Sequence, residues 1–276
     1  YRDSPSDHIF DLFDEQLFPD HPLGRNILGT RESLRSFDRT DLTSFVSRLY
    51  RPENIILASS GQLSLPQVLR AWSKAIPAAI ESHSSPDRIP PLSYSPSATD
   101  LSREQVQTHC IMGNRAYPSG HDNALALYVV NNILGGPTMN NRLNLNIRER
   151  YGLTYNLESF YSPMSDTGTW GVYLSTDPGY AERVIQLVFR ELKQLRERPL
   201  GVLQLSKAKR QVQGQIAMAQ ENPGSAVGSA ARAWLHRDEI DPLEKTLERI
   251  EKLTAKELMD AANEVFDPHQ LSSIIL

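Results

Sequence analysis

The stretch LGGPTMNNRLNLNIRERYGLTYNLESFY, residues 134–161, predicts a short helix followed directly by a strand. Its start, Gly135-Gly136-Pro137, is a signal that ends a preceding helix and makes a turn. Gly152 suits the left-handed conformation in which helices end, and the Thr, Tyr and Phe residues from 154 onward favour a strand. Three apolar residues between these signals recur at every fourth position and predict one buried helix face: Met139, Leu143 and Ile147.

Two polar side chains flank the predicted change from helix to strand. Arg148 lies in the last helical turn, where a cation complements the helix dipole, and Tyr155 begins the strand seven residues later. A guanidinium and a phenol are both hydrogen-bond donors, so from these positions the two can point into one cleft. The alternative is that Arg148 only balances the helix dipole and that Tyr155 only packs on the sheet.

Three motifs in this chain resemble the C-terminal portion of the pitrilysin/insulinase family of zinc metallopeptidases, which includes insulin-degrading enzyme and the mitochondrial processing peptidase. They are GG-x-x-M-x-x-R-L from Gly135, R-E-R-x-G-L-x-Y from Arg148, and H-P-L-G-R-x-x-x-G from His21. The resemblance implies that Arg148 and Tyr155 bind the substrate carbonyl across the cleft from zinc. Physical chemistry agrees, because donors aimed at a developing oxyanion lower the barrier of acyl transfer.

Residues 1–76 carry helix patterns on either side of one apolar run. A helix begins at Pro5, and residues 41–50 and 65–76 predict two more, with Thr30 and Thr40 as candidate N-caps. The run at 54–60, NIILASS, predicts a buried strand. This is about half of an α+β unit, and the first residues contain no Met and have the pattern of a helix already under way, so we expect a fragment.

Residues 77–100 are rich in Pro and Ser and predict a linker. Residues 101–276 contain a complete set of alternating strand and helix patterns. The strands are expected at 105–112, 155–161, 169–175 and 271–276, and the helices at 121–134, 178–196, 203–220, 226–235, 243–252 and 254–266. The pattern predicts an α+β fold with a largely antiparallel sheet covered on one face.

The family resemblance refines this organisation. It implies two related α/β-sandwich units of the processing-peptidase type, facing each other across a cavity. Residues 1–76 would be the C-terminal part of the first, zinc-bearing unit, and residues 101–276 a complete second unit on the substrate-binding side.

Composition limits the classes of partner. The 276 residues are 39% hydrophobic and 22% charged, which is ordinary for a globular protein, and the net charge of −4 argues against nucleic acid. No apolar run reaches the ~20 residues that a membrane helix needs. Cys110, the only cysteine, cannot form an internal disulfide and is expected to be a buried core thiol.

The family's zinc motif, an inverted H-x-x-E-H on a helix, is not found in this sequence. The segment nearest to it, His236-Arg237-Asp238-Glu239-Ile240, has Ile in the place of the second His. The resemblance therefore implies zinc ligands upstream of Tyr1, and no catalytic or metal-binding residue in this chain. Polar residues near Arg148 and Tyr155 are further candidates for the cleft: Asn140, Asn141 and Asn156.

Two functions follow from these observations. The first is a fragment of a zinc-dependent metalloendopeptidase that hydrolyses peptides in a closed chamber, with this part binding the substrate carbonyl. The second is a non-catalytic peptide-binding or structural subunit of the same family, paired with a zinc-bearing chain. A third reading is an α+β domain unrelated to proteolysis.

Either family reading implies a peptide or unfolded polypeptide as partner and is compatible with a homodimer or a heterodimer with a family subunit. Neither nucleic acid nor a membrane is expected. The compartment stays open, with the cytoplasm as a working guess.

We predict that this chain alone neither binds catalytic zinc nor cleaves peptides, because a catalytic zinc site needs about three protein ligands and an open position for water. Metal analysis of the purified chain, with a fluorogenic peptide assay with and without zinc, checks this. Tightly held stoichiometric zinc together with chelator-sensitive cleavage would contradict it.

Overall fold

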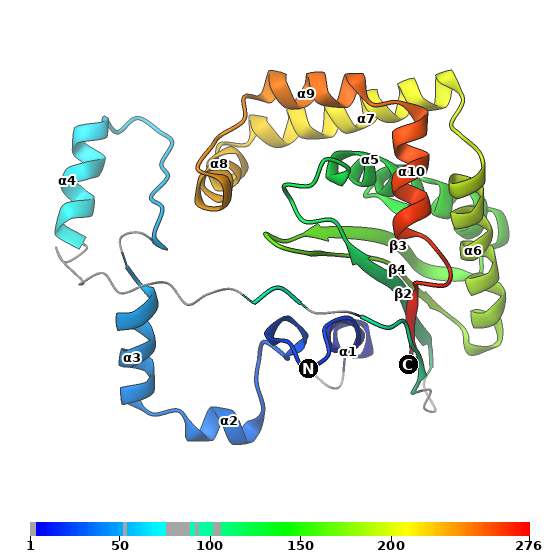
Figure 1. Ribbon diagram of the computed structural model, residues 1–276, viewed down its shortest axis with the longest axis horizontal. Helices are drawn as coiled ribbons and strands as arrows, with labels where there is room; N and C mark the ends of the chain where they lie inside the picture. Colours follow the sequence, from blue (N-terminus) through cyan, green and yellow to red (C-terminus); the bar gives the residue numbers. More distant parts are fainter. Residues whose placement is uncertain (1–3, 52–53, 76–88, 92–93, 102–105) are drawn as a thin grey trace. The chain divides into compact units, whose positions relative to one another are not determined.

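A computed structural model of the chain shows an α+β fold built on a five-stranded sheet (Figure 1). It describes residues 4–51, 54–75, 89–91, 94–101 and 106–276. The sheet order is β1-β5-β2-β4-β3, in which β1 and β5 are parallel and the other pairs are antiparallel. The largely antiparallel sheet agrees with the prediction, whereas β1 and its parallel pairing were not predicted. The strands are β1 (Ala98–Asp100), β2 (Thr108–Ala116), β3 (Thr154–Pro163), β4 (Gly168–Thr176) and β5 (Ser272–Ile275).

The helices occupy most of the positions that the hydrophobic periodicity predicted. They are α1 (Pro5–Leu17), α2 (Arg31–Ser36), α3 (Arg39–Leu49), α4 (Leu65–Ala75), α5 (Ala124–Gly135), α6 (Ala181–Glu197), α7 (Val202–Glu221), α8 (Pro223–Arg237), α9 (Leu243–Lys252) and α10 (Ala255–Val265). Short turns are η1 (Pro22–Gly24), the π-helical η3 (Asn144–Glu149) and η4 (Pro178–Tyr180). No helix in the described part of the chain is both long and apolar enough to cross a bilayer.

Contacts between residues divide the chain into two compact units. The sheet unit comprises residues 1–28, 90–212 and 250–276, and the other comprises residues 29–89 and 213–249. This division differs from the sequence-based one, which separates residues 1–76 from 101–276, because α1 packs against β2 and β5 of the sheet.

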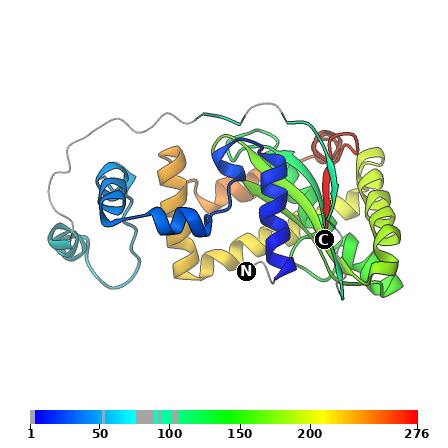
Figure 2. The ribbon, with the colours of Figure 1, turned by 90° about the horizontal axis from the view of Figure 1, so that it is seen from below.

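The sheet is covered on both faces, whereas the sequence predicted cover on one. On one face, α5 and α10 pack against β2 and β3, and the Trp170 ring stacks on Phe266 at 4.2 Å between centroids. On the other, α1 lies along the sheet (Figure 2). The side chains of α1 that face the sheet are fully buried, each contributing about 1.5–3 kcal/mol: Ile9, Phe13 and Leu17.

Two glycines let aromatic rings reach the sheet on the α1 side. Gly113 of β2 and Gly171 of β4 are paired in register. A Cβ atom at Gly113 would lie 2.8 Å from the Phe13 ring, and one at Gly171 would lie 2.7 Å from the Phe160 ring. The absent side chains therefore make the space into which Phe13 and Phe160 pack.

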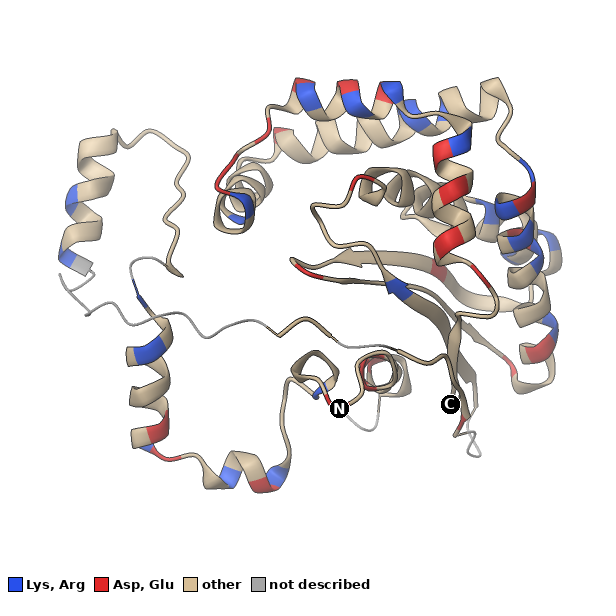
Figure 3. Ribbon diagram, viewed as in Figure 1, with Lys and Arg blue, Asp and Glu red and all other residues tan. Residues whose placement is uncertain are grey.

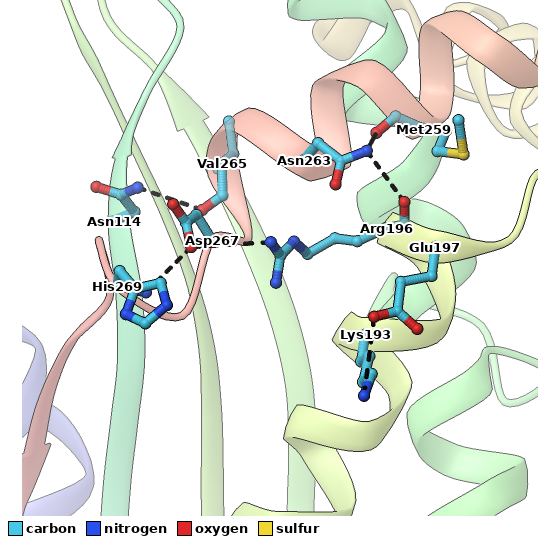
Figure 4. A network of polar contacts seen from close by, with 9 residues as sticks. All are labelled: Asn114, Lys193, Arg196, Glu197, Met259, Asn263, Val265, Asp267 and His269. Atoms are coloured by element: carbon cyan, nitrogen blue, oxygen red, sulfur yellow. Dashed lines mark hydrogen bonds and ion pairs between the residues drawn. The ribbon is translucent and has the colours of Figure 1, made fainter.

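Polar contacts hold the end of α10 to its neighbours (Figure 4). The Asn263 amide donates to the carbonyl oxygen of Arg196, at the end of α6, at 3.0 Å. The Arg196 guanidinium lies 3.8 Å from the Asp267 carboxylate, and the Asn114 amide of β2 donates to the carbonyl oxygen of Val265. These contacts align α6, α10 and β2, which together support the core beneath α5.

The predicted strand at 54–60 is wrong. Residues 55–60 form neither helix nor strand, and the described residues provide no strand that pairs with them. An apolar run becomes a strand only where another backbone satisfies its hydrogen bonds, and the run itself does not contain that information. Leu57, at its centre, is 44% exposed.

Two further boundaries differ from prediction. The linker ends earlier than residue 100, because Ala98–Asp100 forms β1 on β5; residues 76–88 and 92–93 of the linker lie outside the described residues. Asp38, not Thr40, is the N-cap of α3, and it forms a capping box with Asp41. Thr30 caps α2 as predicted.

A buried amide fixes the turn between α5 and η3. The Asn141 side chain is 5% exposed, and its Nδ2 donates to the carbonyl oxygens of Gly136 and Thr138, both at 2.7 Å. Its Oδ1 accepts from the Asn144 backbone N–H at 2.8 Å. Gly135 lies against β3, where a Cβ would be 2.6 Å from the Ser159 nitrogen. The turn therefore requires both a glycine and an asparagine.

We predict that Asn141→Ala destabilises the sheet unit by about 1–3 kcal/mol, because it leaves buried backbone groups without their partner. Chemical denaturation followed by circular dichroism measures the change. Asn140→Ala is the matched control, since the Asn140 amide makes an exposed contact with Gln211 and should cost far less. Equal losses in the two variants would contradict this role for Asn141.

Asp14 on α1 makes stability depend on pH. Burial, with the nearby Asp11 carboxylate, raises the pKa of Asp14 to about 6. The folded state therefore holds this proton more tightly than the unfolded state, and the stabilisation that is present below about pH 4 is lost as pH rises through about 6. We predict that Asp14→Asn raises the melting temperature at pH 7 and flattens its dependence between pH 4 and 6, while the exposed Glu15→Gln does neither.

Candidate functional site

The candidate site lies where the chain turns from η3 into β3. Arg148 is in η3, and the Gly152 N–H donates to the carbonyl oxygen of Arg148 at 2.9 Å to close the last turn. Gly152 has φ of +62°, the left-handed conformation that its position predicted. β3 then begins at Thr154, so Arg148 and Tyr155 lie at the adjoining ends of a helix and a strand that pack together.

The predicted helix is present but contains a π-helical turn over Asn144–Glu149. Leu143 and Ile147 are fully buried and anchor it to the core, whereas Met139 is 64% exposed. The prediction that Met139 belongs to the buried face is therefore wrong, because it precedes the helix and lies in the Asn141 turn. A π turn widens the helix locally and is frequent at functional sites.

Tyr155 is 53% exposed at the start of β3. The pairing of β3 with β4 shifts by one position between Thr154 and Asn156, an irregularity that re-aims the side chain between them. The Tyr155 hydroxyl donates to Asp177 Oδ1 at 3.2 Å, and this carboxylate raises the pKa of Tyr155. The phenol therefore stays protonated and remains a donor.

Arg148 is half-buried, and no described residue forms an ion pair or a hydrogen bond with its guanidinium. Arg142, in the turn before η3, differs, because its guanidinium lies 3.8 Å from the buried Glu191 carboxylate. The Arg142 guanidinium therefore has a structural role as the partner of Glu191. The N–H donors of Arg148 remain available to a ligand.

The three asparagines that the sequence suggested as cleft residues have different positions. Asn141 is buried, and its amide is used within the turn. The Asn140 amide donates to Gln211 Oε1 at 2.9 Å. Asn156 is exposed beside Tyr155, and its backbone N–H donates to Ser175 Oγ at 3.2 Å.

Sequence patterns alone missed Asp177. The register of the β3–β4 hairpin, which pairs Thr154 with Thr176, brings Asp177 next to the start of β3. The pairing of the two predicted strands was the signal that could have located it. Asp177 also precedes η4 and α6, so it links the site to that helix.

Zinc does not fit the residues that this structure describes. Among them, no group of three or more His, Cys, Asp or Glu side chains is placed to hold a metal ion. His236 lies in the last turn of α8, and its neighbour Arg237 pairs with Asp241 at 3.0 Å. Cys110 is fully buried as predicted, and burial raises the pKa of its thiol to about 12.

Comparison with known proteins connects this geometry with a family. Residues 36–212 match the family model described as the peptidase M16 inactive domain. An uncharacterized zinc protease of Mycobacterium leprae is 27% identical over 99% of this chain, and the uncharacterized zinc protease YmxG of Bacillus subtilis is 24% identical over 96%. The chain spans 62% and 64% of the length of these two relatives.

Solved structures share the fold. The peptidase M16 inactive domain from Pseudomonas fluorescens matches with a TM-score of 0.90 at 20% identity, covering 99% of this chain and 66% of that one. A chain of complex III2 from Candida albicans matches with a TM-score of 0.85 at 17% identity, covering 99% and 67%. The resemblance seen in the sequence motifs is confirmed, and this chain belongs to the peptidase M16 family through its inactive domain.

Proposed function

We propose that this chain is the substrate-binding part of a zinc-dependent metalloendopeptidase, in which Arg148 and Tyr155 bind the carbonyl oxygen of the peptide bond to be cleaved. The observation that carries the proposal is the pair itself. A guanidinium without a described protein partner and an exposed phenol lie at adjoining ends of η3 and β3. The family match and the relatives named as zinc proteases support the reaction class.

The pair suits a reaction in which negative charge grows on a carbonyl oxygen. Attack on a peptide carbonyl converts a neutral oxygen into an oxyanion, and donors fixed beforehand stabilise the charge that appears. Arg148 contributes a permanent cation and Tyr155 a neutral donor. A phenol has only one O–H. The Tyr155 hydroxyl must therefore break its hydrogen bond to Asp177 before it can donate to the substrate carbonyl. Asp177 therefore holds the ring in place and competes weakly with the substrate.

The zinc ligands of this proposal come from outside this chain, from the further third that its relatives contain. We propose that residues 1–76 belong partly to that zinc-bearing unit. Support comes from the exposed apolar side chains on α3, which a soluble monomer rarely leaves uncovered. They are exposed by 61%, 49% and 46%: Leu42, Phe45 and Val46. Peptides would then be hydrolysed in a closed chamber between two such units.

A non-catalytic subunit is the second candidate, favoured by the fold shared with a chain of complex III2. In that case, the chain binds polypeptide or stabilises an assembly with a zinc-bearing partner. Metal content and peptide cleavage by the full-length protein separate the two. Zinc-dependent cleavage by that protein alone supports the endopeptidase, and cleavage only after a second family subunit is added supports the alternative.

We predict that Tyr155→Phe in the full-length enzyme lowers kcat about tenfold or more, by loss of one donor to the oxyanion. The melting temperature should barely change, because among the described residues the hydroxyl bonds only to Asp177, in an exposed contact. Tyr180→Phe is the matched control, since Tyr180 is 45% exposed on the neighbouring η4. Unchanged turnover in Tyr155→Phe, or an equal loss in Tyr180→Phe, would refute the assignment.

A further inference from the structure

Three arginines surround the ring of Tyr151. The Arg150 and Arg183 guanidinium carbons lie 5.5 Å and 5.4 Å from the ring centroid, and the Arg190 guanidinium lowers the pKa of the Tyr151 hydroxyl. Figure 3 shows Lys and Arg along α6 together with acidic residues. We refer to these four residues as the Tyr151 cluster.

Two separate elements build the cluster. Arg150 and Tyr151 follow η3 directly, and Arg183 and Arg190 lie on α6, seven residues apart and so on the same stripe of the helix. The opposite stripe of α6 is buried in the core through Val184, Val188 and Leu192. The packing of α6 therefore turns both arginines outward, toward the ring that η3 supplies.

The positive charge of the cluster is not neutralised by an ion pair with any carboxylate that the structure describes. Farther along α6 the cations are paired, Lys193 with Glu197 and Arg196 with Asp267, both at 3.8 Å. Glu182 lies beside Arg183, but its carboxylate accepts from the Gln186 amide. Three like charges around one ring repel one another, and a bound anion removes that cost.

We propose that the Tyr151 cluster binds carboxylate side chains of an acidic polypeptide segment. The inference rests on the proposed function, because Tyr151 lies between Arg148 and Tyr155 in the chain, and a polypeptide held by those two residues runs close to it. Guanidinium groups match carboxylates in geometry through paired N–H donors. The Tyr151 hydroxyl is free to donate its proton to the same carboxylate. The Arg190 guanidinium lowers the pKa of Tyr151 and makes it a stronger donor.

The cluster is exposed, so binding should be modest and strongly reduced by salt. The test is fluorescence anisotropy of this chain with two labelled peptides of one sequence, containing Asp and Glu in one and Asn and Gln in the other. The acidic peptide should bind about tenfold more tightly at low salt. The double variant Arg183→Ala/Arg190→Ala should abolish that preference, whereas Lys193→Ala on the same helix should keep it. Circular dichroism confirms that each variant is folded.

Two results overturn the proposal: equal affinity for the two peptides, or a preference that survives in the double variant. Displacement of the acidic peptide by inorganic phosphate at equal ionic strength, with phosphate binding the more tightly, would assign the cluster to phosphate and overturn the polypeptide assignment. The carbonyl-binding proposal is tested separately, because it fails if Tyr155→Phe leaves the turnover of the full-length enzyme unchanged. If the unmodified chain shows no preference for the acidic peptide while Tyr155→Phe still lowers turnover, the cluster proposal alone is refuted.

Discussion

The close approach of α5 to β3 is the constraint on which the rest of the sheet unit depends. Gly135 leaves no room for a side chain against the Ser159 backbone, and the Asn141 amide then holds the chain in a tight turn. Leu143 and Ile147 are buried in the core directly after this turn. Their packing fixes the orientation of the helical segment and with it the direction of the Arg148 side chain. Gly135, which has no side chain, thus helps to determine where Arg148 and Tyr155 lie.

Local sequence signals predicted the structure well where the interaction was itself local. Gly152 in its left-handed conformation and the adjacent strands β3 and β4 all depend on residues close in sequence. The strand predicted at 54–60 was wrong and β1 was missed, because both depend on residues distant in sequence. A strand depends on its partner, and the partner of β1 lies at the far end of the sequence, in β5.

Arg148 and Tyr155 were found from spacing and family resemblance, but their surroundings were not. The Asp177 contact requires a known hairpin register, and the Tyr151 cluster requires α6 to pack beside η3. Composition did not indicate the cluster either. The net charge of −4 is a sum over the whole chain and contains no information on where charges of one sign lie together. Three arginines without an ion pair to any described carboxylate lie close in sequence or space to Tyr151, in a chain whose net charge is negative.

The π-helical turn of η3 has a consequence for how this segment tolerates change in length. A π turn is an α-helical turn that has accommodated one additional residue, so Leu143 and Arg148 are related by a register that a regular helix does not have. Deleting one residue between them would restore regular α geometry and leave Arg148 close to its present direction, because the wider turn already contains the additional residue. The same deletion in a regular α-helix would rotate every later side chain by about 100° around the axis. This segment can therefore lose one residue and keep its guanidinium, which a regular helix could not do.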